Sequence, residues 1–208
     1  MCCGLQRSGS TAQFNIVRHL FSIKGVQPYT SFITGYNQND KSLVHIIKSH
    51  IVPPLLLQQM DEKRPTGIEL LTTHRDIRDA AASAVRMGWA PNNQNIANYA
   101  KEILARYKPS ARHAIHNMRY EDFQSNPGNT VQDIATALDI ELSAQENTAI
   151  LDHLETGNDS DKLDNETLLH PNHCGTGEIG TYKEQLSQEA ITAIEDNCGD
   201  WLREHNYI

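Results

Sequence analysis

The fold is decided by Gly4-Leu5-Gln6-Arg7-Ser8-Gly9-Ser10-Thr11, a glycine-containing turn near the start of the chain. The apolar segment Met1 to Leu5 leads into this turn. Ala12 to Ile23 follows it, with apolar residues at the spacing of an amphipathic helix. A strand, a turn and a helix in this order place successive backbone N–H groups and a helix N-terminus around one point. The stretch therefore predicts a cradle for phosphate oxygens.

Further along the chain, apolar segments alternate with helical patterns. Strands are predicted at Leu43 to Lys48, Ile68 to Thr73 and Ala114 to Arg119. Helices are predicted at Ile77 to Met87, Ile96 to Tyr107, Asn126 to Leu138 and Ser187 to His205. This alternation predicts an α/β fold of the P-loop type. We expect a three-layer sandwich in which helices flank a central, mostly parallel sheet of about four to five strands.

The bulk properties narrow the class of protein. A chain of 208 residues suits a single domain spanning 1–208. No segment approaches the ~20 apolar residues of a membrane span, and no signal-peptide pattern precedes the glycine turn. The net charge of -8 argues against a partner such as nucleic acid. The four cysteines show no metal-ligand spacing. We expect a cytoplasmic protein with no membrane partner, and the oligomeric state stays open.

Residues 156–180 form a long segment rich in Gly, Asn, Asp and His with little periodicity. Long loops in compact domains usually serve function, so we expect this one to lie over the nucleotide or acceptor site. His170, His173 and Cys174 in this loop raise the possibility of zinc. They lack a fourth ligand at the usual spacing, so no metal site is predicted.

The glycine turn lacks the lysine of nucleotide triphosphatases. The pattern G-x-x-x-x-G-K-[ST] has Ser10 in the place of its lysine, and the strand ending at Thr73 is not followed by a metal-binding aspartate. A γ-phosphoryl group needs lysine and Mg²⁺ to spread its charge. A sulfuryl group carries less charge, so Arg7 and backbone donors suffice. The alternatives are an ATP-dependent small-molecule kinase, or a plain turn that caps a helix.

Five segments, taken in order, resemble the sulfotransferase family. Arg7-Ser8-Gly9-Ser10-Thr11 is similar to its phosphosulfate loop, K/R-S-G-[ST]-T, and Thr73 to Ser83 is similar to its second nucleotide signature. Lys48-Ser49-His50 resembles its lysine-threonine-histidine element. Tyr120 to Phe123 and Gly177 to Lys183 resemble its Y-E-D-[LF] and G-x-x-G-x-[WY]-K elements. The resemblance spans nearly the whole chain.

The resemblance implies a reaction and a set of roles. The donor would be 3′-phosphoadenosine 5′-phosphosulfate (PAPS), and the acceptor a hydroxyl or amine of a small molecule or glycan, without a required metal. The implied catalytic residues are His50 as general base, Lys48 as donor to the leaving oxygens, and Arg7 as the grip on the 5′-phosphosulfate. The implied nucleotide-binding residues are Arg7, Ser8, Gly9, Ser10, Thr11, Arg75, Ser83, Tyr120 and Gly177, of which Arg75 and Ser83 would hold the 3′-phosphate.

Simpler interpretations stay open for several of these residues. His50 also suits a histidine satisfied within the sheet, and Lys48 a solvated strand-end lysine. Arg75 suits an ion pair with Asp76 or Asp79, and Tyr120 suits core packing equally well. Two departures from the family pattern also allow a catalytically degenerate nucleotide-binding protein. Ala12 replaces the tryptophan expected to stack on adenine, and Gly175-Thr176 replaces an arginine-lysine pair.

Overall fold

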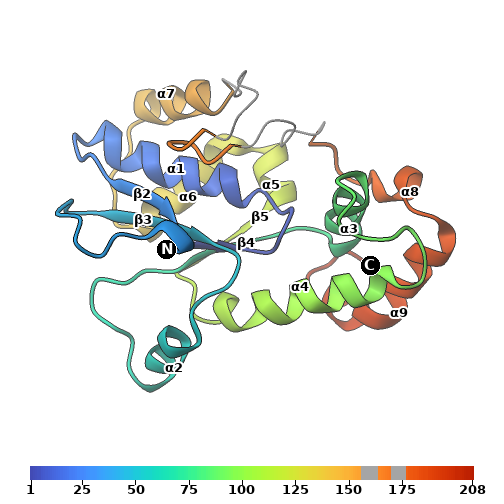
Figure 1. Ribbon diagram of the computed structural model, residues 1–208. Helices are drawn as coiled ribbons and strands as arrows, with labels where there is room; N and C mark the ends of the chain where they lie inside the picture. The colour runs from blue at the N-terminus through green and yellow to red at the C-terminus, as the bar shows by residue number, and fades with distance from the viewer. Residues whose placement is uncertain (156–163, 170–176) are drawn as a thin grey trace.

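The computed structural model describes residues 1–155, 164–169 and 177–208. Its centre is a five-stranded sheet with the strand order β2-β3-β1-β4-β5, and every pair of neighbouring strands is parallel (Figure 1). This confirms the expected sheet. The strands are β1 (Cys2–Gly4), β2 (Tyr29–Phe32), β3 (His45–Ser49), β4 (Leu71–His74) and β5 (His116–Arg119).

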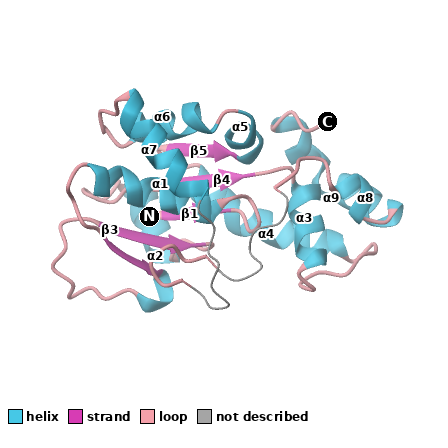
Figure 2. Cartoon of the chain, turned by 90° about the horizontal axis from the view of Figure 1, so that it is seen from above, coloured by secondary structure: helices cyan, strands magenta, loops and turns pink. Residues whose placement is uncertain are grey.

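Helices cover both faces of this sheet, which confirms the three-layer architecture (Figures 1 and 2). One face carries α1 (Ser10–Ile23), α6 (Pro127–Ala137) and α7 (Ala144–Glu155). The other face carries α2 (Pro54–Glu62) and α4 (Ile96–Ala111). Towards the carboxyl ends of the strands lie α3 (Ile77–Arg86), α5 (Tyr120–Ser125), α8 (Tyr182–Gln185) and α9 (Gln188–Glu204).

Adjacent residues of the central strand β1 serve opposite faces of the sheet. Cys2 packs into the core beneath α1, which contains Phe14 and Leu20, and Cys3 packs into a smaller core with Met60 of α2. This alternation is the two-residue period of a β-strand. β1 is covered on both faces and has a strand on either side. Its packing therefore fixes the position of the phosphate loop that follows it.

The structure adds elements that the sequence patterns did not predict: β2, α2, α5, α7 and α8. All five are short or lie towards the surface, so their burial patterns are weak. β2, for example, has no fully buried residue and forms an edge of the sheet. Among the described residues, no helix combines the length and the apolar character needed to cross a membrane.

Candidate functional site

The loop between β1 and α1 has the backbone conformation of an anion cradle. Arg7 and Gly9 both have positive φ angles, 64° and 82°, which turn the chain sharply. A positive φ is uncommon for a residue with a side chain, so Arg7 holds a constrained position. Helix α1 begins directly after Gly9, and its first backbone bond runs from Gln13 N–H to the Gly9 carbonyl at 3.1 Å. The partial positive charge of the helix N-terminus therefore points into the loop.

Two glycines in this loop are required by close contacts. A Cβ at Gly4 would lie 2.0 Å from the Thr73 side-chain oxygen of β4. A Cβ at Gly9 would lie 2.7 Å from the ring of Tyr120. Glycine at both positions lets the loop lie flush against β4 and α5. The Ser8 hydroxyl is also buried here and donates to the Leu5 carbonyl at 2.6 Å.

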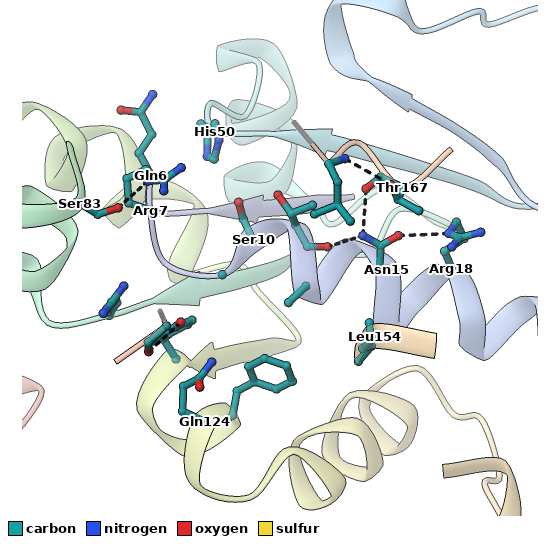
Figure 3. Close-up of a pocket in the computed structure, with 18 of the residues that line it drawn as sticks. Gln6, Arg7, Ser10, Asn15, Arg18, His50, Ser83, Gln124, Leu154 and Thr167 are labelled. Atoms are coloured by element: carbon teal, nitrogen blue, oxygen red, sulfur yellow. Dashed lines mark hydrogen bonds between the residues drawn. The ribbon is translucent and has the colours of Figure 1, made fainter. Parts of the chain in front are cut away.

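A cavity of about 560 Å³ opens beside this loop at the carboxyl ends of the strands (Figure 3). Ligands of parallel α/β sheets bind at this edge. The residues that line it come from the loop and α1, from the segments that follow β3 and β4, from α3 and the turn after it, from α5 and α7, and from the described parts of residues 156–180. They are Gln6, Arg7, Gly9, Ser10, Thr11, Ala12, Asn15, Arg18, His19, His50, Arg75, Ser83, Arg86, Trp89, Tyr120, Phe123, Gln124, His153, Leu154, Thr167, Leu169 and Gly177.

The cavity is electropositive although the protein carries a net charge of -8. Four arginines line it, namely Arg7, Arg18, Arg75 and Arg86, and no described lining residue is acidic. Burial lowers the pKa of the Arg7 guanidinium, and the positive charge of Arg86 lowers it further. A concentration of cations without acids favours an anionic ligand.

His50 lines the cavity and directly follows β3. Its Nδ1–H donates to the Gly4 carbonyl at 2.9 Å, because a carbonyl oxygen can only accept. This bond fixes the tautomer and leaves Nε2 with a free lone pair. Burial lowers the pKa of His50 below its usual value, and the nearby positive charges of Lys48 and Arg7 lower it further. The imidazole is therefore neutral at neutral pH.

Lys48 lies behind the loop instead of on the cavity wall. Its side chain is 2% exposed, and Nζ donates to the Thr11 hydroxyl, which does line the cavity. Nζ also lies 5.4 Å from the ring centre of Phe32. Burial lowers the pKa of Lys48 to about 8. Its burial rules out the alternative interpretation of Lys48 as a solvated strand-end lysine.

Arg75, Ser83, Tyr120 and Gly177 are brought together on one side of the cavity. Arg75 lies 4.3 Å from the ring centre of Tyr120, and the Tyr120 hydroxyl donates to the Gly177 carbonyl at 3.1 Å. Arg75 also pairs with the buried Asp79 at 3.7 Å, so the ion-pair interpretation describes part of its surroundings. Ser83 accepts a hydrogen bond of 2.9 Å from Arg7 Nε (Figure 3).

The structure thus places eight of the nine positions expected to bind the nucleotide on the cavity wall. The exception is Ser8, whose hydroxyl is directed towards Leu5 and β4, so only its backbone faces the loop. The described residues hold no cluster of His, Cys, Asp or Glu suited to a metal ion. His170, His173, Cys174 and Gly175-Thr176 lie outside the described residues.

Several lining residues had not been predicted from the sequence. Asn15, Arg18 and His19 share one face of α1 with Thr11, and this three-to-four-residue spacing was a signal that could have identified them. The ring of His19 stacks on that of His153 from α7 at a centroid distance of 4.9 Å. Arg86 follows Ser83 by one helical turn, which is a similar signal.

Known proteins resemble this chain at the level of family and fold. The family described as "Sulfotransferase domain" matches residues 1–206. No curated protein sequence gives a significant match. Among solved structures, mouse sulfotransferase SULT7A1 complexed with PAP has a TM-score of 0.68 at 13% identity, covering 97% of this chain and 82% of that one. Retinol dehydratase in complex with androsterone and the inactive cofactor PAP has a TM-score of 0.65 at 15% identity, covering 96% and 79%.

At these identities the solved structures establish a shared fold, with a parallel sheet flanked by helices. The family match extends over almost the whole chain and includes the loop, Lys48, His50 and the Arg75–Ser83 segment. The chain belongs to the sulfotransferase family.

Proposed function

We propose that this sulfotransferase takes its sulfuryl group from PAPS and transfers it to a hydroxyl or amine acceptor, with His50 as the general base. The observation that supports this proposal most is the position of His50. A neutral imidazole, with its tautomer fixed by the Gly4 carbonyl, lines a cavity that four arginines also line. Proton acceptance and anion binding are thus provided side by side.

The residues present suit a nucleotide with two anionic ends. The loop, α1 and Arg7 provide backbone donors and one cation for the 5′ end. Arg75 and Ser83 provide a guanidinium and a hydroxyl for the 3′-phosphate. Ala12 and Phe123 of α5 both line the cavity, and the Phe123 ring is a candidate stacking surface for adenine. The charges and donors of these residues support PAPS as the donor.

His50 acts on the acceptor. Nε2 takes the acceptor hydroxyl proton as the acceptor oxygen forms its bond to sulfur, and the bond from sulfur to the phosphate oxygen breaks. The donor supplies the sulfuryl group and leaves as 3′-phosphoadenosine 5′-phosphate (PAP). The Nδ1–H bond to Gly4 stabilises the imidazolium formed in this step, because it is made from the opposite side of the ring.

Lys48 and Arg7 act on the leaving phosphate. Both cations lie near the start of α1, where negative charge develops as the bond to sulfur breaks. Lys48 reaches this region through the Thr11 hydroxyl, so its ammonium polarises a donor that lines the cavity. Arg7 is positioned by Ser83 at 2.9 Å and by the Trp89 ring, whose centre lies 5.4 Å from its guanidinium carbon.

Calorimetry tests the donor assignment. We expect PAP to bind with micromolar affinity in a buffer that contains EDTA, because arginines and backbone donors provide the positive charge of the site. Mg-ATP is expected to bind more weakly. Tight binding of Mg-ATP without binding of PAP would instead support the small-molecule kinase, and absence of both would support the degenerate protein.

Arg75→Ala is expected to lower PAP affinity by about tenfold or more, because it removes a charge-assisted contact to the 3′-phosphate. The change also opens the pair with Asp79 and the bond to the Glu178 carbonyl. Thermal unfolding without nucleotide therefore measures the structural effect separately. Unchanged PAP affinity in a folded variant would show that Arg75 has only the structural role.

The proposal also covers the class of acceptor and the cellular location of the protein. We infer a small molecule or glycan bearing a hydroxyl, consistent with a solved relative whose structure contains androsterone. A cytoplasmic location is consistent with Cys2, Cys3 and Cys198, which are buried free thiols. A screen of hydroxylated acceptors with radiolabelled PAPS tests the acceptor class directly.

A further inference from the structure

Arg86 is a cavity residue to which no role has been assigned. It is the last residue of α3 and lies three positions after Ser83, so the two side chains leave the helix on the same face. Both line the cavity beside Arg7. The positive charge of Arg86 lowers the pKa of the Arg7 guanidinium, as expected for two cations that line the same cavity.

Arg86 differs from the other cavity arginines in its surroundings. Arg75 pairs with Asp79 and Arg18 pairs with Glu166, whereas Arg7 donates to Ser83. Within the described residues, the Arg86 guanidinium makes no hydrogen bond and no ion pair. An exposed cation that lies beside other cations and has no acidic partner in the described part of the chain is available to bind an anionic ligand.

The 3′-phosphate of the donor needs such a cation. A phosphate monoester carries a charge of about -1.5 to -2 at pH 7. On the proposed 3′ side, Ser83 is neutral and the charge of Arg75 is largely offset by Asp79, whose side chain is fully buried. One further positive charge is required for balance. Arg7 donates to Ser83 but is assigned to the 5′ end of the nucleotide, which leaves Arg86 as the cavity arginine that shares a helix face with Ser83.

We propose that Arg86 is a ligand of the 3′-phosphate. This inference rests on the proposed function, because it assumes a nucleotide with a 3′-phosphate in the cavity. It makes Arg86 a specificity-determining residue that distinguishes PAP from adenosine 5′-phosphate, which has no 3′-phosphate.

Two other roles for Arg86 are separable by experiment. A cation in the last turn of α3 stabilises the helix dipole, which affects stability but not ligand preference. A cation beside the exposed Trp89 also suits an acidic acceptor, which affects the acceptor KM but not nucleotide binding. Both roles predict unchanged discrimination between the two nucleotides.

The test is calorimetry of PAP and adenosine 5′-phosphate, without acceptor, on the wild type and Arg86→Ala. We expect the variant to lose about tenfold in affinity for PAP and to keep its affinity for adenosine 5′-phosphate, so the ratio of the two dissociation constants falls about tenfold. Arg86→Lys is expected to recover part of the ratio. Arg203→Ala, which removes an exposed arginine of α9, is the matched control and should leave the ratio unchanged.

The outcomes distinguish this inference from the function on which it rests. A wild type that does not prefer PAP over adenosine 5′-phosphate would overturn the assignment of the donor. A wild type with the preference and an Arg86→Ala variant with the same ratio would overturn the role of Arg86 alone. An equal loss for both nucleotides, with a lower unfolding temperature, would identify Arg86 as a structural residue of α3.

Discussion

Replacing His50 by alanine is expected to lower the rate of sulfuryl transfer by about 10²- to 10⁴-fold, the usual contribution of a general base. Affinity for PAP should stay unchanged, because Nδ1 of His50 bonds to the Gly4 carbonyl and the base acts on the acceptor. The measurements are transfer from radiolabelled PAPS to an acceptor found by screening, and calorimetry with PAP. Full turnover in a folded variant would show that His50 is not the base.

The pH profile gives a second measurement of the same residue. Because burial lowers the pKa of His50 below 6.5, Nε2 is unprotonated at neutral pH. We expect kcat/KM to be level near pH 7 and to fall only as the pH drops below 6.5 and the imidazole becomes protonated. The residual activity of His50→Ala should lack this fall.

His45 provides a matched control for His50, since it belongs to the same strand β3 but lies outside the cavity. Its ring bonds to the Ser42 carbonyl at 3.0 Å. His45→Ala should therefore keep transfer activity close to that of the wild type. His50→Asn supplements the alanine variant, because its amide can keep the bond to Gly4 but cannot accept the proton.

Lys48→Met is expected to stabilise the protein while lowering both transfer and PAP affinity. Lys48 is 2% exposed, and its pKa falls from 10.5 to about 8. At about 1.4 kcal/mol per pKa unit, this shift corresponds to a cost of about 3 kcal/mol for holding the charged form in the fold. Methionine fills a similar volume without the charge, and the lost bond to Thr11 offsets about 1 kcal/mol. The free energy of unfolding at pH 7 should rise by about 2 kcal/mol.

The pH dependence of this difference identifies its cause. The folded protein releases the Lys48 proton near pH 8 and the unfolded chain near pH 10.5. The destabilisation is therefore fully present below pH 8 and disappears as the pH rises to 10.5. Urea unfolding of both proteins across this range should show the stability of the wild type approaching that of Lys48→Met.

Lys41→Met is the control, because Lys41 is exposed in the loop before β3. It should change neither stability nor transfer measurably. A Lys48→Met protein less stable than the wild type at pH 7 would show that the ammonium stabilises the fold through Thr11 and Phe32. A variant with normal PAP affinity and turnover would remove Lys48 from the mechanism.

The sequence predicted the parts of the fold that have strong periodic patterns. The central strand β1, the helix α1 and the buried helix α9 were placed within a few residues of their observed bounds. β2 was missed because all four of its residues are half-buried and it lies at the sheet edge, where neighbouring strands and not its own pattern determine its pairing. α2 was missed because it begins at Pro54 and has only one buried residue, Met60.

For the site, the resemblance of the motifs to the sulfotransferase family predicted Arg7, His50, Arg75 and Ser83 as site residues, and all four line one cavity. It could not distinguish a side chain on the cavity wall from one behind it. Ser8 and Lys48 both belong to the motifs, yet their side chains are buried, because Ser8 bonds to Leu5 and Lys48 bonds to Thr11. Such contacts join residues distant in the sequence, and only the packed sheet brings them together.

By itself, the sequence Gly4 to Thr11 determined that a strand, a phosphate loop and a helix would follow one another, because local backbone geometry requires glycine and a helix start at these places. The tertiary structure alone decided the chemistry of the residues around the loop. Parallel pairing of β1 with β3 brought the Gly4 carbonyl to the His50 ring and buried the Lys48 side chain. Burial then set their protonation states, and burial is a property of the whole fold.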